Sequence, residues 1–378
     1  MFKRRIFTEE QNVFRENVSK FFKKEIVPFH SDWEKKGIVP KSFWLKAGGQ
    51  GILCPNVPKE YGGIGGDFRF NVIVIEELSK IAATGPGFAV HSDIVSPYFI
   101  NYGSEVQKSY YLPKMISGEI ITAIAMSEPS TGSDLQNIKT TAFLDEDKIV
   151  LNGSKTFITN GQNADLIIVV AKTDNSKKAK GISLVLCEKD RGGFTRGKNL
   201  KKIGMKAQDT SELFFDNVIL PKENVLGLPG HGFFQLMDEL PQERLSIAVS
   251  AISAAEAALE WTILYAKERS AFKRKIIEFQ NTKFTLAQLK SELTVARTYI
   301  DRCVKEHINN NFSAEDGAIA KLWCTDLQFK VIDKCLQIHG GYGYMEEYKI
   351  SRAFVDARVQ RIYGGTNEIM KEIISRNL

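Results

Sequence analysis

The sequence lacks the short motifs that identify many enzyme classes. It contains no G-x-G-x-x-G, no G-x-x-x-x-G-K-[ST] and no G-x-S-x-G, so Rossmann, P-loop and α/β-hydrolase chemistry have no local support. Its five cysteines lie far apart, without a C-x-x-C pair or a Cys/His cluster. This spacing excludes a disulfide framework and the usual zinc sites. We therefore expect no metal ion and a reducing, cytoplasmic location.

Long apolar runs and a strong charge of one sign are also missing. No apolar run reaches the roughly 18 residues that a membrane-spanning helix needs, so we expect no membrane span. The 51 Lys and Arg against 45 Asp and Glu give a net charge of +6. This charge falls short of the basic surface of a nucleic-acid-binding protein, and no nucleic-acid partner is expected. The length of 378 residues and the hydrophobic share of 43% are typical of a globular chain with two or three domains.

The chain divides into three segments that differ in the pattern of their apolar residues. Residues 1–123 begin with the T-x-x-Q spacing of a capping box at Thr8 and Gln11, which predicts a helix rather than a targeting peptide. Apolar residues then recur at helical spacing, so this segment is predicted to be a helical domain. Residues 124–228 hold short β-branched runs between turns, typical of an antiparallel barrel or sandwich. Residues 229–378 hold long helical stretches that predict a helix bundle, and the fold class is therefore α+β. The predicted strands are 148–152, 156–159, 166–171, 181–187 and 212–220, and the predicted helices are 233–268, 280–309, 314–339 and one from 367 onward.

Two regions are unusually rich in glycine and small polar residues. Residues 125–134 offer hydroxyls and backbone amides at close spacing, which suits a polar ring edge or a pyrophosphate, although this composition is also typical of a turn. Residues 337–343 and 361–368 contain glycine pairs that permit close approach of a ligand. A glycine after a helix is also an ordinary C-cap. Residue type alone leaves both interpretations open.

These regions carry a resemblance to a known family. The chain resembles the acyl-CoA dehydrogenases over essentially its whole length. The resemblance implies a helical N-terminal domain, a middle antiparallel β-barrel and a C-terminal four-helix bundle, with FAD held without a Rossmann fold. It also implies an acyl-CoA substrate, electron-transfer flavoprotein as the acceptor, and a homo-oligomer, commonly a tetramer built as a dimer of dimers. The motifs that carry it are residues 102–108, 126–134, 155–160, 269–280 and 337–343.

The same resemblance assigns cofactor residues one by one. Some belong to the flavin ring and the pyrophosphate, others to the FAD of a neighbouring subunit, and others to the adenosine end. One position departs from the family, because Lys273 stands where most members have glycine. The residues assigned to the flavin ring are Met126, Ser127, Phe157, Ile158 and Thr159, and Ser133 is shared between the pyrophosphate and the substrate. The residues assigned to contact the FAD of a neighbouring subunit are Arg269, Phe272 and Gln280. The residues assigned to the nucleotide end of FAD are Gln337, Gly340, Gly341, Thr366, Asn367 and Glu368.

The catalytic base has moved relative to most of the family. The reaction needs a carboxylate beside the α-carbon of the acyl thioester and the flavin behind the β-carbon. Most members place this glutamate at a position that is Gly364 here. Glu243, in Leu-Pro-Gln-Glu-Arg-Leu, matches the position used by long-chain and isovaleryl-CoA dehydrogenases, and the long-chain type matches better. We assign Gly364 to polarisation of the thioester carbonyl through its backbone amide. The residues assigned to the substrate are Ser133, Lys180, Phe234, Pro241, Arg244, Gly364 and Gly365.

We therefore expect FAD-dependent α,β-dehydrogenation of a saturated, long-chain acyl-CoA to trans-2-enoyl-CoA in fatty-acid β-oxidation. A branched substrate such as isovaleryl-CoA stays open, since chain length depends on the depth of the pocket. An oxidase that passes its electrons to oxygen is a second alternative. A flavin- or CoA-binding module without catalysis is a third, and Glu243 argues against it.

Overall fold

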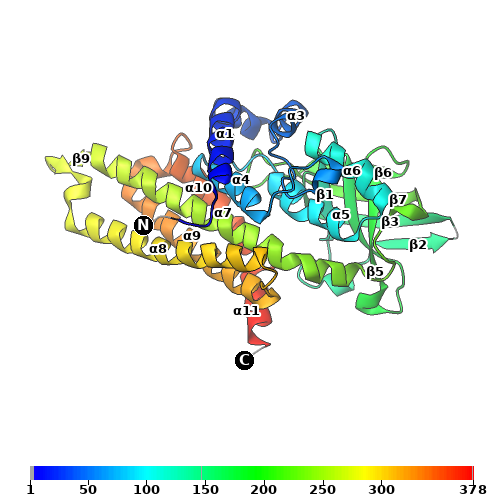
Figure 1. The fold of residues 1–378 in the computed structure, drawn as a ribbon. Helices are drawn as coiled ribbons and strands as arrows, with labels where there is room; N and C mark the ends of the chain where they lie inside the picture. Colours follow the sequence, from blue (N-terminus) through cyan, green and yellow to red (C-terminus); the bar gives the residue numbers. More distant parts are fainter. Residues whose placement is uncertain (1–3, 146, 377) are drawn as a thin grey trace.

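The computed structural model describes residues 4–145, 147–376 and 378. Figure 1 shows a sheet, in green, at one end of a set of long helices that run from yellow-green to orange. The N-terminal helices, in blue and cyan, lie across the region between them. The three-part order of helices, sheet and helices is the one that the sequence predicts. The domain boundaries at 123/124 and 228/229 stay a prediction.

From residue 4 onward, the N-terminal region contains six α-helices, the short 3-10 helix η1 (Lys59–Tyr61) and a π-helical segment. The predicted capping box is confirmed, because the Thr8 hydroxyl accepts a hydrogen bond from the backbone of Gln11 and the Gln11 side chain accepts one from the backbone of Thr8. The elements are α1 (Glu9–Glu25), α2 (His30–Lys36), α3 (Lys41–Gly49), α4 (Phe68–Lys80), the π-helical segment η2 (Ala89–Val95), α5 (Ser96–Tyr102) and α6 (Glu105–Ser117).

The middle region is one mixed sheet. Its strands are β1 (Thr122–Ala125), β2 (Thr141–Asp145), β3 (Lys148–Thr159), β4 (Leu166–Lys172), β5 (Ile182–Glu188), β6 (Phe194–Asn199), β7 (Thr210–Pro221) and β8 (Val225–Leu226). They follow the order β6-β7-β3-β2-β4-β5-β8, with β1 paired to β4. The pairings of β1 and β2 with β4 are parallel, and the others are antiparallel.

The predicted antiparallel β-barrel is therefore wrong, because the sheet is open. Among the described residues the outer strands β6 and β8 do not pair with each other. β8 contains only two residues before the chain leaves for the C-terminal helices, which is too short a ladder to close the sheet. Strand β4 is instead buried on both faces. Ile168 and Val170 pack with residues of α5 and α6, while Ile167 and Val169 pack with residues of β3 and β7.

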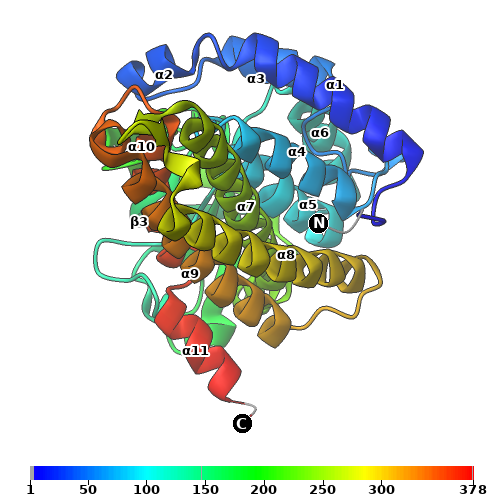
Figure 2. The same ribbon diagram turned by 90° about the vertical axis from the view of Figure 1, so that its left-hand side faces the viewer.

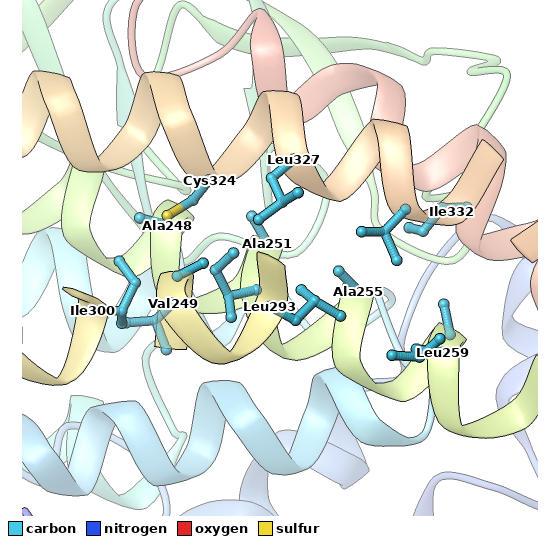
Figure 3. Close-up of a cluster of buried hydrophobic side chains, with 14 of the residues drawn as sticks. Ala248, Val249, Ala251, Ala255, Leu259, Leu293, Ile300, Cys324, Leu327 and Ile332 are labelled. Carbon is cyan, nitrogen blue, oxygen red and sulfur yellow. The ribbon is translucent and has the colours of Figure 1, made fainter. Parts of the chain in front are cut away.

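The C-terminal region contains three long helices and two short ones: α7 (Gly232–Glu268), α8 (Gln280–Ile308), α9 (Ala314–His339), α10 (Lys349–Ala357) and α11 (Asn367–Ser375). Figure 3 shows side chains from α7, α8 and α9 pointing toward one another, among them Ala251, Leu293 and Leu327. Small residues on α7, such as Ala248 and Ala255, let the helices approach closely. Figure 2 shows α11, in red, extending from the base of these helices toward the C-terminus.

Helix α7 is long and apolar enough to cross a membrane by length and composition, and among the described residues it is the one such helix. In its most apolar stretch, 56% of the residues are buried inside the protein. The core helix of a globular protein passes the same test, so this is weak evidence for a span. The expected lack of a membrane span stays a prediction.

Candidate active site

A cavity of about 790 Å³ is lined by residues from all three regions. One wall comes from α4 and η2, a second from the loop after β1 and from β3, and a third from α7 and the loop before α11. It brings together the predicted base, the predicted flavin contacts and the late glycine pair. The predicted residues that line it are Met126, Ser127, Ser133, Phe157, Ile158, Thr159, Glu243, Arg244, Gly364 and Gly365.

Glu243 is a buried carboxylate in the lining of this cavity, with 4% of its surface exposed. The phenol of Tyr98, on α5, donates a hydrogen bond to its Oε1 across 3.0 Å. Burial raises the pKa of Glu243 to about 7, although the Tyr98 hydrogen bond and the charge of Arg244 act to lower it. A carboxyl with a pKa near neutrality is suited to general-base catalysis, since it is ionised at working pH and still basic enough to take a proton.

A second buried carboxylate lies one turn earlier on α7 and does not line the cavity. Glu239 accepts a hydrogen bond of 2.6 Å from Nδ2 of Asn101, and burial raises the pKa of Glu239. Its charge also acts to raise the pKa of Glu243. Glu239 therefore belongs to the surroundings of the base, and it gives a matched position for testing the base by substitution.

Gly364 packs against the part of α7 that follows the base. Its φ of +65° is in the left-handed region, and a Cβ there would lie 2.5 Å from Cδ1 of Ile247. Nε of Arg244 donates a hydrogen bond of 3.3 Å to the carbonyl oxygen of Gly364. A larger residue at 364 would thus be strained and would displace Ile247. Gly364 and Glu243 occupy two sides of one site, which gives a physical reason for a base on α7 together with glycine in the late loop.

A buried lysine holds the loop that carries Met126 and Ser127. Nζ of Lys155, on β3, donates to the carbonyl oxygen of Met126 at 3.0 Å and to Oε1 of Glu128 at 2.9 Å. Burial lowers the pKa of Lys155 to about 8, against the opposing charge of Glu128. The backbone amide of Thr156 adds a hydrogen bond of 2.9 Å to the carbonyl oxygen of Ser127. These bonds fix the loop against β3.

The cavity suits the ring system of a flavin. The pairing of β3 with β7 shifts in register between Lys155 and Ile158. Phe157, in this irregular stretch, has a φ of +60° and is 71% exposed. Gln328, on α9, also lines the cavity, and its buried Oε1 has no hydrogen-bond partner among the described residues. An apolar wall with a buried acceptor fits a planar ring that carries an N–H group.

Six predicted cofactor residues lie away from this cavity, at the far end of the long helices. Near this end the guanidinium carbon of Arg269 lies 5.5 Å from the centre of the Tyr342 ring. These residues are exposed, and Phe272 is exposed to 90%. They do not line the cavity within one chain, and their assigned contacts with the FAD of a neighbouring subunit and with the adenosine end stay predictions. The six residues are Arg269, Phe272, Gln280, Gln337, Gly340 and Gly341.

Lys273 lies in the hairpin between β9 (Ser270–Ala271) and β10 (Arg274–Lys275). Phe272 and Lys273 have φ angles of +50° and +64°. Positive φ at both central residues is the mark of a tight two-residue hairpin turn, in which glycine is favoured. The lysine therefore keeps the turn in a conformation that a glycine would adopt without steric cost.

The remaining predicted residues lie outside the cavity lining. Thr366 caps α11 by accepting a hydrogen bond from the amide of Ile369, and Glu368 in the first turn is exposed. Asn367 is buried, and its side chain accepts a hydrogen bond from Nζ of Lys321 at 2.8 Å. Phe234 and Lys180 are exposed, whereas Pro241 lies within α7 beside the start of α9. The roles assigned to these residues stay predictions.

Comparison with known proteins supports the same interpretation of the whole chain. The acyl-CoA dehydrogenase N-terminal, middle and C-terminal domain models match residues 8–119, 123–218 and 230–378. The chain belongs to the acyl-CoA dehydrogenase family. The predicted family and enzyme class, an oxidoreductase, are thereby confirmed.

Among the relatives of this acyl-CoA dehydrogenase is the long-chain specific acyl-CoA dehydrogenase, mitochondrial, of Sus scrofa, 50% identical over 99% of this chain and 88% of that protein. The isovaleryl-CoA dehydrogenase, mitochondrial, of Solanum tuberosum is 35% identical over 99% of this chain and 91% of that protein. The crystal structure of an acyl-CoA dehydrogenase from Geobacillus kaustophilus has a TM-score of 0.97 and 48% identity over 99% of each chain. Relatives with different substrates therefore share the fold.

Sequence reasoning missed three residues of the site. Tyr98 contacts the base from 145 positions away, and no local pattern marks it. Lys155 is the first residue of the motif at 155–160, but no sequence pattern marks it as buried and paired with Glu128. Asp93 lines the cavity from η2, and a lone aspartate within an apolar helical stretch was the signal that could have found it.

Proposed function

We propose that this protein dehydrogenates long-chain acyl-CoA to trans-2-enoyl-CoA in fatty-acid β-oxidation, with Glu243 as the base. The observation that carries the proposal is the buried Glu243 carboxylate in a cavity whose other walls are the predicted flavin contacts. The long-chain preference is supported by the 50% identity with the pig long-chain enzyme. FAD is the cofactor of this family's chemistry.

The reaction breaks two C–H bonds of the substrate and forms one C=C bond. Glu243 takes the α-proton on a carboxylate oxygen, and FAD, when bound, accepts the β-hydride. Burial keeps water away from Glu243 and raises the pKa of its carboxyl, which makes the carboxylate a stronger base toward the α-proton. Tyr98 holds one carboxylate oxygen, so the other oxygen is the one that faces the α-carbon. The reaction balances because the proton ends on Glu243, the hydride with its two electrons ends on the cofactor, and the substrate becomes the enoyl thioester.

The thioester carbonyl needs polarisation, because its α-proton is a weak acid. The backbone amide of Gly364 is our candidate donor, since the loop that carries it packs beside the base. Arg244 supports that loop by its hydrogen bond to the Gly364 carbonyl. A fixed amide in a dry site stabilises the enolate-like charge that develops on the oxygen.

The remaining parts of the proposal concern assembly and partners. A second copy would complete the FAD site through the exposed residues around Arg269 and Phe272, and we propose a homo-oligomer on this ground. The proposal of a tetramer, a dimer of dimers, rests on the family resemblance. Electron-transfer flavoprotein is the proposed electron acceptor. A cytoplasmic location is consistent with five cysteines that are all free and buried.

Anaerobic titration of the flavin absorbance tests the function. We expect palmitoyl-CoA to bleach the holoenzyme faster than butyryl-CoA or isovaleryl-CoA. Glu243→Gln should slow bleaching about a thousandfold, the scale of losing a general base. Glu239→Gln, a buried carboxylate one turn away, is the matched control and should stay within about tenfold of the parent. Rapid bleaching of Glu243→Gln would overturn the assignment of the base.

A branched substrate is the second candidate, supported by the isovaleryl-CoA dehydrogenase of Solanum tuberosum among the relatives. The same titration separates the two. Fastest bleaching by isovaleryl-CoA would keep Glu243 as the base and move the enzyme to branched-chain degradation.

A further inference from the structure

The cavity contains a polar pair that the dehydrogenation itself does not use. Asp93, on η2, is 4% exposed, and Asn71, on α4, is 1% exposed. Nδ2 of Asn71 donates a hydrogen bond of 2.6 Å to Oδ1 of Asp93. Both residues line the cavity that holds Glu243. They come from two different elements, so the pair is built by the fold and not by a local turn.

The hydrogen-bonding capacity of this pair is only partly used. Oδ1 of Asn71 is buried without a partner among the described residues. Within the same residues, the Asp93 carboxyl accepts its hydrogen bond from Asn71 alone. Burial raises the pKa of Asp93 to about 7, so the group is present as acid and as carboxylate near neutral pH. The pair can therefore both donate to a ligand and accept from it.

The surroundings make this arrangement costly unless it binds something. Most of the neighbouring cavity residues on the same two elements are apolar, among them Val74, Ile75 and Ile94, and the hydroxyls of Ser79 and Ser92 already have hydrogen-bond partners in the backbone. A buried polar group without a partner costs about 1–3 kcal/mol. Stability alone would favour an aliphatic side chain at both positions.

The backbone directs Asp93 to this place. It lies in a π-helical segment, a form that is rare and occurs mostly at functional sites. Nε2 of Gln242 donates a hydrogen bond of 2.7 Å to the Asp93 carbonyl oxygen. Gln242 directly precedes Glu243, so the segment that carries Asp93 is tied to the turn of α7 that carries the base.

We propose that Asn71 and Asp93 form a subsite for a hydroxyl group on the acyl chain, so that the preferred substrate is a hydroxylated acyl-CoA. A hydroxyl can donate to one member of the pair and accept from the other, which a methylene cannot do. The hydroxyl lies beyond the β-carbon, because a hydroxyl on either carbon that loses hydrogen would give an enol instead of the simple trans-2-enoyl thioester of the proposed function. This inference rests on the proposed function and deepens it by naming the substrate class.

The test compares kcat/KM for palmitoyl-CoA with that for palmitoyl-CoAs carrying one hydroxyl at successive carbons beyond the β-carbon. The holoenzyme should prefer one hydroxylated isomer by about tenfold or more, because a site built to bind a hydroxyl leaves polar groups unpaired with the plain chain. Asp93→Leu and Asn71→Leu should bring the ratio of kcat/KM for the hydroxylated chain to kcat/KM for the plain chain to about one. Each substitution should lower kcat/KM for the hydroxylated chain and raise it for the plain chain. Asp93→Asn keeps the shape of the side chain and should lower the ratio without loss of folding.

A buried amide elsewhere provides the matched control. Asn224 donates to the carbonyl oxygen of Leu186 at 2.7 Å, outside the cavity lining, and Asn224→Leu should lower the melting temperature and leave the ratio unchanged. A ratio near one at every carbon in the parent enzyme would overturn the subsite and leave the dehydrogenase intact. The subsite is also overturned if the Asp93 and Asn71 variants melt early with an unchanged ratio, since the pair would then serve the fold. Failure to oxidise any acyl-CoA would overturn both proposals.

Discussion

The phenol of Tyr98 donates a hydrogen bond to Oε1 of Glu243 across 3.0 Å, and both side chains are buried. Two opposing effects act on the carboxyl through this arrangement. Burial destabilises its ionised form and raises its pKa, whereas the hydrogen bond stabilises that form and lowers the pKa. The pKa of Glu243, and with it the strength of the base, therefore depends on two opposing effects: burial in the cavity and the hydrogen bond from Tyr98.

Tyr98→Phe should move the pH profile of the enzyme. The base acts when ionised, so kcat/KM of the parent should fall as the pH drops through about 7. Loss of the hydrogen bond raises the pKa of Glu243 further, and the acidic limb should shift to higher pH. Activity near pH 9 should stay within about tenfold of the parent, since the base is ionised there in both proteins. An unchanged limb with uniformly lower activity would show that Tyr98 serves packing alone.

Lys155→Met should reduce the flavin content of the purified protein. The substitution frees the carbonyl oxygen of Met126 and leaves Glu128 as a buried charge without its cation, a loss of about 3–5 kcal/mol. The ratio of flavin absorbance to protein absorbance measures the effect. Lys148→Met, on the same strand but at the surface, is the matched control and should keep its flavin. Full flavin content and an unchanged visible spectrum in Lys155→Met would contradict the proposed support of the loop.

The fold was largely predictable because its long elements repeat a local pattern. The helices predicted at 280–309 and 314–339 are α8 and α9 to within one residue. The short strands were less predictable, since their stability comes from distant partners. β1, β2 and β6 were missed, and the runs at 148–152 and 156–159 proved to be one strand with two irregularities. That the sheet stays open was not predicted, because it depends on the two-residue strand β8, which no local pattern marks.

The candidate site was predictable where it follows a motif and not where it depends on the fold. Glu243 and Gly364 were found through the resemblance, and the cavity contains both. Tyr98 contacts Glu243, and Asp93 lines the cavity, from elements distant in sequence from α7. These two side chains become buried, and their polar atoms need hydrogen-bond partners inside the protein, only when α4, η2, α5 and α7 pack together. Contacts of that kind follow from tertiary structure and not from residue spacing.

Lys273→Gly should stabilise the hairpin between β9 and β10. Lys273 has a φ of +64°, which costs an L-residue about 1 kcal/mol relative to glycine. The gain should appear as a higher urea midpoint for loss of flavin, because this hairpin belongs to the proposed contact with a second copy. Lys275→Gly is the contrasting control: at its φ of −69° glycine relieves no strain, and the change adds flexibility and removes the hydrogen bond of 2.8 Å from Nζ to the Glu268 carbonyl oxygen, so it should lower the midpoint. Equal midpoints for the two variants would show that the turn is not strained.

Glu76→Gln should weaken the attachment of the N-terminal residues to the C-terminal helices. Glu76 is 1% exposed, and its carboxylate pairs with Arg297 at 2.9 Å, Arg4 at 2.8 Å and Arg15 at 2.7 Å. Burial alone would raise the pKa of Glu76, but the three arginine charges outweigh it and the pKa lies below its ordinary value of 4.5. The ionised form therefore stabilises the fold above that pH, and the stabilisation is lost as the pH falls below it.

At pH 7 we expect Glu76→Gln to reduce the free energy of unfolding by about 3 kcal/mol, because it leaves buried cations with fewer partners. Guanidinium unfolding followed by circular dichroism measures this loss, and the difference from the parent should shrink as the pH falls below the ordinary carboxyl pKa. Glu292→Gln breaks a surface pair with Lys330 and should cost less than about 1 kcal/mol. Equal losses for the two substitutions would mean that the buried cluster contributes no more than a surface ion pair, and that the N-terminal helices are held by apolar contacts alone.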